Sequence, residues 1–124
     1  MKHTLKIIKH FKEWVEEQLE IKSPAKVQLH KSRKILKTYA DYSPNESIVR
    51  TYISERSLAD CLRSIAHELV HHKQNEQGRI KGGDYDVELE DEANAFAGRL
   101  IRAYANKYPE SKVYDTVIKH DKDK

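Results

Sequence analysis

The spacing of apolar residues along this chain changes from a helical period to alternation and back, which limits the folds it can adopt. Residues 4–21 carry apolar side chains three and four positions apart, as on one face of an amphipathic helix. The same spacing returns over residues 57–77 and 87–107. Only the segment between the first two helices alternates apolar and polar residues, as half-buried strands do. The order helix, small sheet, helix, helix predicts an α+β domain.

The alternating segment predicts a small mixed sheet of about three strands. The expected strands lie within "AKVQLHKS", "ILKTYADYS" and "ESIVRTYIS", with a turn at Pro44 and Asn45 between the last two. The third strand is rich in β-branched and aromatic residues. We expect it to be an edge strand, along which an extended peptide could bind through main-chain hydrogen bonds.

Capping residues set the ends of the predicted helices. Ser57 is suited to cap the second helix and Gly78 to end it. The third helix stops before Pro109. Residues 110–124 then form a C-terminal tail whose apolar side chains predict either docking on the body of the protein or, as the alternative, a segment lying across a cleft.

Composition favours one globular domain over residues 1–124, because 38% of the residues are hydrophobic and 35% are charged. The net charge is only +3 and the basic residues are dispersed along the chain, so we expect no nucleic-acid partner. A single cysteine, Cys61, cannot form an internal disulfide, and we expect it to be a small core residue. No stretch is apolar enough to be a signal peptide or to span a membrane, so we expect a cytoplasmic protein.

Residues 65–74, "IAHELVHHKQ", place His67 and His71 four positions apart, with Glu68 directly after the first. At 100° per residue, both histidines lie roughly opposite the apolar stripe of their helix. They are therefore either solvated surface residues or residues that face a cleft. In a cleft, imidazoles at this spacing can both bind one tetrahedral Zn²⁺ ion.

These residue types suit peptide-bond hydrolysis. Zn²⁺ bound by neutral histidines lowers the pKa of a metal-bound water to about 7. Glu68 can then take the proton of that water and pass it to the leaving amine. The motif predicts a zinc metalloendopeptidase whose partner is a peptide or protein substrate.

A third protein ligand is needed, and the segment "DVELEDEANAFAGRLI" offers several carboxylates. Asp91 lies opposite the apolar stripe of this helix, whereas Glu88, Glu90 and Glu92 flank the stripe and can each face a cleft. Helix-dipole preference is an alternative explanation for acidic residues in these first turns. Periodicity does not choose among the three glutamates.

"HELVHH" followed by "EDEANAFA" resembles the small gluzincin-type metallopeptidases, in particular ImmA/IrrE-like peptidase domains and the minimal gluzincins. The resemblance covers residues 57 to 104. It implies a zincin-like fold in which His67 and His71 are metal ligands and Glu68 is the general base. It also implies that Glu92 is the third ligand.

Some positions depart from that family pattern. Many gluzincins have an acidic residue four positions after the third ligand to orient a histidine, but here that position is Phe96, which leaves Asn94 and Asp91 as candidates. Tyr85 is our candidate for stabilising the tetrahedral intermediate, although it could instead pack against the helix that follows it. We expect His72, near the apolar stripe, to be a packed or capping residue and not a ligand.

Two other classes of function compete with the peptidase. The first is a non-catalytic binding or adaptor module, either zinc-stabilised or metal-free. The second is a small nucleic-acid accessory protein, motivated by four lysines in the first helix, where the helix dipole does not favour cations: Lys2, Lys6, Lys9 and Lys12. Metal analysis with a peptide-cleavage assay addresses the first alternative, and salt-sensitive duplex binding addresses the second.

Overall fold

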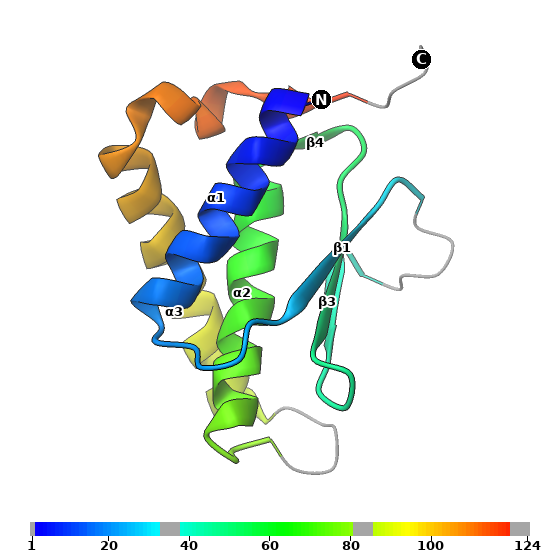
Figure 1. The fold of residues 1–124 in the computed structure, drawn as a ribbon, viewed down its shortest axis with the longest axis vertical. Helices are drawn as coiled ribbons and strands as arrows, with labels where there is room; N and C mark the ends of the chain where they lie inside the picture. The colour runs from blue at the N-terminus through cyan, green and yellow to red at the C-terminus, as the bar shows by residue number, and fades with distance from the viewer. Residues whose placement is uncertain (1, 33–37, 81–85, 120–124) are drawn as a thin grey trace.

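The computed structural model describes residues 2–32, 38–80 and 86–119, and it has the predicted α+β composition. The elements are α1 (Lys2–Gln18), β1 (Lys26–His30), β2 (Ala40–Ser43), β3 (Ile48–Tyr52), β4 (Arg56–Ser57), α2 (Leu58–Glu76), α3 (Val87–Lys107), 3₁₀ turns at Pro109–Ser111 and Val113–Asp115, and β5 (Val117–Ile118). Helix α2 contacts both other helices and the sheet, and so forms the centre of the molecule (Figure 1).

The three-stranded sheet has the order β1-β3-β2 and is mixed. Strand β3 runs parallel to β1 and antiparallel to β2. The expectation that "ESIVRTYIS" forms an edge strand is therefore wrong, since β3 lies in the centre. The predicted turn at Pro44 and Asn45 folds β3 back beside β2, and β1 covers its other edge. One face of β3 is buried: Val49 and Thr51 are both 0% exposed, whereas the alternate residues of this strand are partly exposed, and β3 contacts α2.

Helix α1 follows the predicted periodicity but ends earlier than expected, at Gln18. Glu20 adopts a left-handed conformation with φ 55°, which takes the chain out of the helix before the predicted end at residue 21. The buried face of the helix packs in the hydrophobic core, through Ile7, Ile8, Phe11, Trp14 and Val15.

Helix α2 has the predicted caps. The Ser57 hydroxyl accepts a hydrogen bond from the Asp60 backbone N–H at 3.0 Å, and Gly78, with φ 72°, follows the end of the helix. Its apolar stripe is completely buried and consists of Leu58, Leu62, Ile65 and Leu69. Cys61 is also buried, as predicted, and burial raises the pKa of its thiol to about 11.

Helix α3 has the predicted bounds, and Asp86 caps its start by accepting a hydrogen bond from the Leu89 N–H at 2.9 Å. Helix α3 packs against α2. Its first turns lie beside the second half of α2, where the histidine motif lies. Within the described ranges, no helix is both long and apolar enough to cross a bilayer.

The described part of the C-terminal tail docks on the body of the protein. Val113 and Ile118 are buried, and β5 pairs antiparallel with β4. The Thr116 carbonyl oxygen accepts a hydrogen bond from the Leu58 N–H at 2.8 Å, at the first turn of α2. The tail up to residue 119 therefore supports the start of the central helix, as the docking interpretation predicted.

Candidate metal centre

Two side chains of α2 and one of α3 converge at one point. His67, His71 and Glu90 each offer a ligand atom, and these atoms all lie within 4.8 Å of one another. His67 Nε2 lies 3.0 Å from Glu90 Oε1, and His71 Nε2 lies 3.4 Å from Glu90 Oε2. Ligand atoms bound tetrahedrally to one zinc ion lie about 3.3 Å apart, given bond lengths of about 2.0–2.1 Å. The distances from Glu90 to the two histidines are close to this value, so the group could hold a metal ion.

Glu92, the third ligand implied by the family resemblance, does not belong to this group. Its Oε1 accepts hydrogen bonds from Arg79 Nη1 at 2.8 Å and from Gln74 Nε2 at 2.9 Å. These two donors, Arg79 first, hold the pKa of the Glu92 carboxyl below its usual value. Two residues along a helix are about 200° apart, so α3 can turn only one of Glu90 and Glu92 toward the histidines. The carboxylate that lies with the two histidines is therefore that of Glu90, one of the three that periodicity left open, and not that of Glu92.

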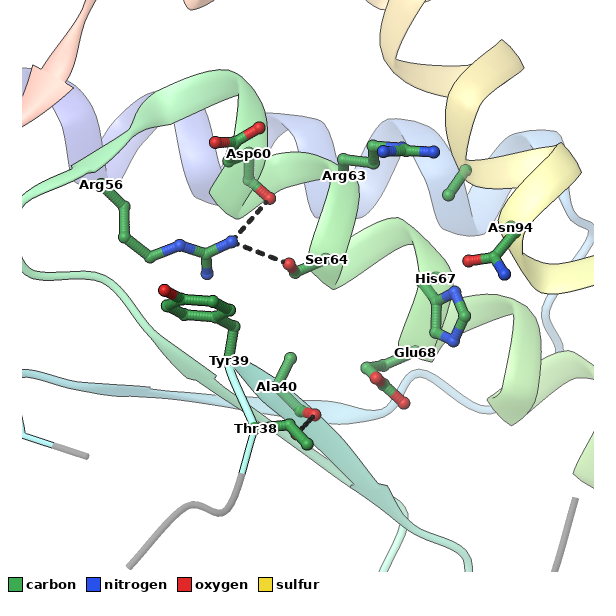
Figure 2. Close-up of a pocket in the computed structure, with 11 residues that line it drawn as sticks. Thr38, Tyr39, Ala40, Arg56, Asp60, Arg63, Ser64, His67, Glu68 and Asn94 are labelled. Carbon is green, nitrogen blue, oxygen red and sulfur yellow. Dashed lines mark hydrogen bonds between the residues drawn. The ribbon is translucent and has the colours of Figure 1, made fainter. Parts of the chain in front are cut away.

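The residue four positions after Glu90 is Asn94, which lies near His67 and lines the same cavity (Figure 2). Asn94 was one of the two candidates for orienting a histidine. The other candidate, Asp91, is exposed on α3.

Gln74 positions His71, a role that the sequence analysis missed. It is 0% exposed, and its Oε1 accepts a hydrogen bond from His71 Nδ1 at 2.7 Å. Its Nε2 donates to the Leu89 carbonyl oxygen at 3.1 Å and to Glu92, which fixes the amide oxygen toward the ring. Because Nδ1 carries the proton, Nε2, the atom directed at Glu90, keeps its lone pair free to bind a cation. The available signal was the spacing of three residues after His71, on the same helical face.

Glu68 is 8% exposed and lies at the wall of the cavity that His67, His71 and Glu90 also line. Burial, followed by the negative charges of Glu90 and Asp41, raises the pKa of its carboxyl to about 8. Burial and the neighbouring His71 lower the pKa of His67, which favours the neutral imidazole that metals require. A divalent cation beside Glu68 would favour its ionised form.

The remaining two predicted residues have different outcomes. His72 is buried, as expected for a packed residue, and both of its ring nitrogens form hydrogen bonds, with the Tyr42 hydroxyl and the Ser23 carbonyl oxygen. Tyr85, our candidate for stabilising the tetrahedral intermediate, lies outside the described residues.

Comparisons with known proteins place this chain in no family. A scan against protein-family models, a search of curated proteins and a search of solved structures each found no match. The function must therefore be inferred from the residues of the cavity themselves.

Proposed function

We propose that this protein is a zinc-dependent metalloendopeptidase of the gluzincin type. His67, His71 and Glu90 bind the ion, and Glu68 is the general base. The convergence of the two histidines with Glu90 beside a buried carboxylate is the observation that carries this proposal. Three protein ligands leave a fourth position for water or substrate, as catalytic zinc sites do. The helix that carries both histidines, packed between the sheet and the second ligand helix, also supports a zincin-like fold.

Glu68 performs the proton transfers in this mechanism. When bound, the zinc ion supplies Lewis acidity that polarises the scissile carbonyl and lowers the pKa of water. Glu68 accepts a proton from the attacking water and donates it to the leaving amine nitrogen. A general acid–base group works best when its pKa lies near the working pH. Burial raises the pKa of Glu68 and a bound cation would lower it, so these opposing effects suit a group that must both accept and donate a proton.

The substrate peptide extends along β2. This strand has β3 as its one strand partner in the described part of the chain, and Ala40, Asp41 and Tyr42 line the same cavity as Glu68. A peptide beside β2 can bind through main-chain hydrogen bonds, which recognise extended chains with little dependence on sequence. Strand β2, and not β3 as the sequence predicted, is thus the edge strand proposed to bind the substrate.

The substitution Glu68→Gln tests the proposal. We expect the variant to bind zinc as the wild type does and to lose about 10²–10⁴-fold in turnover, the usual contribution of general acid–base catalysis. Bound zinc is measured by elemental analysis, and turnover with casein and a fluorogenic peptide, each with and without a chelator. Glu17→Gln, an exposed carboxylate on α1, is the matched control.

Wild-type turnover in Glu68→Gln would contradict the assignment of the base. Stoichiometric zinc without cleavage of any peptide by the wild type would instead support the zinc-stabilised binding module.

A further inference from the structure

A second cavity, of about 320 Å³, adjoins the metal group beside the first turns of α2 (Figure 2). It shares His67 and Glu68 with the cavity that contains Glu90. A substrate residue bound in it would therefore lie next to the bond that Glu68 is proposed to hydrolyse. Two arginines, Arg56 and Arg63, line this second cavity.

The guanidinium group of Arg56 is held in place by neutral groups. It donates hydrogen bonds to the carbonyl oxygens of Tyr52 at 2.9 Å and Asp60 at 3.2 Å, and to the Ser64 hydroxyl at 3.0 Å. Its Cζ lies 4.5 Å from the centroid of the Tyr39 ring. These contacts fix the group without cancelling its charge, because no carboxylate of the described residues lies within 4.0 Å of it.

Arg63 adds a second positive charge from the exposed rim of the same cavity, and it too has no carboxylate partner among residues 2–32, 38–80 and 86–119. By contrast, Arg50 and Arg79 are paired with Asp41 and Glu92. Asp60 is the acidic residue at this end of the cavity, and Figure 2 shows its carboxylate directed away from Tyr39 and Glu68.

The cavity thus carries two guanidinium groups: that of Arg56, which is preorganised beside Tyr39 at the end away from His67, and that of Arg63, which is directed toward α3 (Figure 2). The exposed guanidinium of Arg63 presents its N–H donors in a planar fork, which matches the two oxygens of a carboxylate. Arg56 uses Nη2 to donate to both Asp60 and Ser64, so it contributes its positive charge and its remaining N–H donors. We propose that this cavity binds a carboxylate of the substrate directly beside the scissile bond. The inference rests on the proposed peptidase function. The carboxylate belongs either to an Asp or Glu side chain or to the C-terminus of the substrate.

Matched fluorogenic peptides distinguish these two sources. Each peptide carries Glu, Gln or Lys beside the scissile bond and is made both as a free acid and as a C-terminal amide. We expect kcat/KM to be about 10- to 100-fold higher for Glu than for Gln in both forms, the range of a charge-assisted hydrogen bond. A preference that depends only on the free C-terminus would assign the site to the terminal carboxylate. Cleavage without either preference would overturn the inference and leave the peptidase proposal intact.

Binding of the same peptides to zinc-loaded Glu68→Gln separates this inference from the proposed function. If the wild type cleaves none of the peptides, tighter binding of the Glu peptide or of the free acid still supports the carboxylate site. Equal binding of all peptides would overturn it.

Charge reversal at Arg63 tests whether this exposed arginine causes the preference for a carboxylate. We expect Arg63→Glu to remove the preference for Glu and to favour the Lys peptide. Arg102→Glu, an exposed position on α3, makes the same change in net charge outside this cavity and should keep the preference. Melting temperatures of both variants check that they are folded. Equal effects of the two substitutions would show a general charge effect and contradict a site at Arg63.

Discussion

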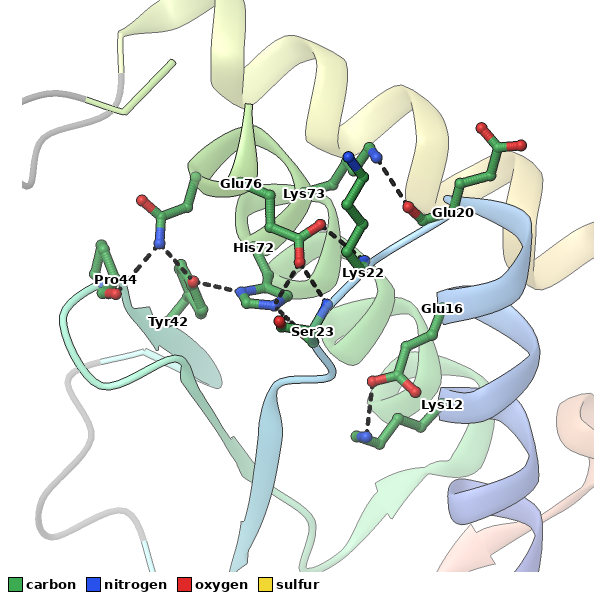
Figure 3. Close-up of polar contacts among 11 residues, drawn as sticks. Lys12, Glu16, Glu20, Lys22, Ser23, Tyr42, Pro44, His72, Lys73 and Glu76 are labelled. Carbon is green, nitrogen blue, oxygen red and sulfur yellow. Dashed lines mark hydrogen bonds and ion pairs between the residues drawn. The ribbon is translucent and has the colours of Figure 1, made fainter. Parts of the chain in front are cut away.

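His71 and His72 are adjacent on α2 and almost equally buried, at 1% and 2% exposure, yet their surroundings differ. His71 directs Nδ1 to Gln74 and Nε2 toward the Glu90 carboxylate, 3.4 Å away. His72 forms a hydrogen bond of 2.6 Å with the Tyr42 hydroxyl through Nδ1 and donates another of 2.6 Å from Nε2 to the Ser23 carbonyl oxygen (Figure 3).

The contrast shows that two equally buried histidines can differ in whether a ring nitrogen is left facing a candidate metal site. The hydrogen bonds of His72 join α2 to β2 and to the segment after α1. In that segment, the backbone N–H groups of Lys22 and Ser23 also donate to the Glu76 carboxylate, at 3.1 Å and 2.8 Å. Both nitrogens of His72 are used in holding these elements together. On the other side, one nitrogen of His71 is oriented by Gln74, while the other faces groups that can share an ion with it.

The first prediction compares the two histidines directly. His71→Ala should lower both zinc affinity and turnover by more than about 100-fold. Removing a residue that merely orients a ligand already costs about 10–100-fold, and removing the ligand itself should cost more. His72→Ala should keep one zinc per chain and lose about 1–3 kcal/mol in the free energy of unfolding, because buried partners lose their hydrogen bonds. Elemental analysis and urea denaturation of both variants measure the two effects. Zinc loss in His72→Ala with zinc retained in His71→Ala would reverse the assignment.

The second prediction concerns the acidic residues of α3. Glu90→Ala should lose most bound zinc during dialysis against a mild chelator, because it removes a ligand. Glu92→Ala should weaken zinc binding by about 10-fold, since Glu92 lies outside the proposed ligand set and acts on it through its hydrogen bond with Gln74. Glu88→Ala, an exposed neighbour, is the control and should resemble the wild type. Loss confined to Glu92→Ala would restore the ligand implied by the family resemblance.

The third prediction concerns Gln74 and Asn75, which are also adjacent on α2. Gln74 contacts His71, whereas Asn75 contacts Tyr42, the partner of His72. Gln74→Leu removes the acceptor for His71 Nδ1 and should weaken zinc binding by about 10–100-fold. Asn75 donates to the Tyr42 hydroxyl and to the Pro44 carbonyl oxygen, so Asn75→Leu should lower stability without changing zinc affinity. Competition with a chromophoric chelator measures both affinities. Equal affinities in the two variants would mean that Gln74 does not orient His71.

The helices could be predicted from the sequence because their signals are local. Periodicity and capping residues gave α3 its observed bounds and α2 bounds within one residue at each end. The early end of α1 was not predictable in this way, because Glu20 adopts a left-handed conformation that usually requires glycine or asparagine. The order of the strands depends on tertiary pairing, and a strand rich in β-branched residues is suited to a central position as well as to an edge.

The site was predictable only in part, for the same physical reason. The spacing of four residues fixes His67 and His71 on one face of α2, wherever that helix lies. Which carboxylate lies beside the two histidines depends on the rotation of α3 about its own axis relative to α2, and the sequence leaves this rotation open. Arg79, which pairs with Glu92, gave no signal that could be recognised without the fold.

Crystallography with anomalous scattering at the zinc edge tests the central claim most directly, because it locates the ion and its ligands together. For protein crystallised with one equivalent of zinc, we predict one anomalous peak per chain, at about 2.0–2.2 Å from Nε2 of His67, Nε2 of His71 and a carboxylate oxygen of Glu90. A fully zinc-loaded crystal with no peak between these three residues, or with the peak bound by Glu92 instead of Glu90, would contradict the account.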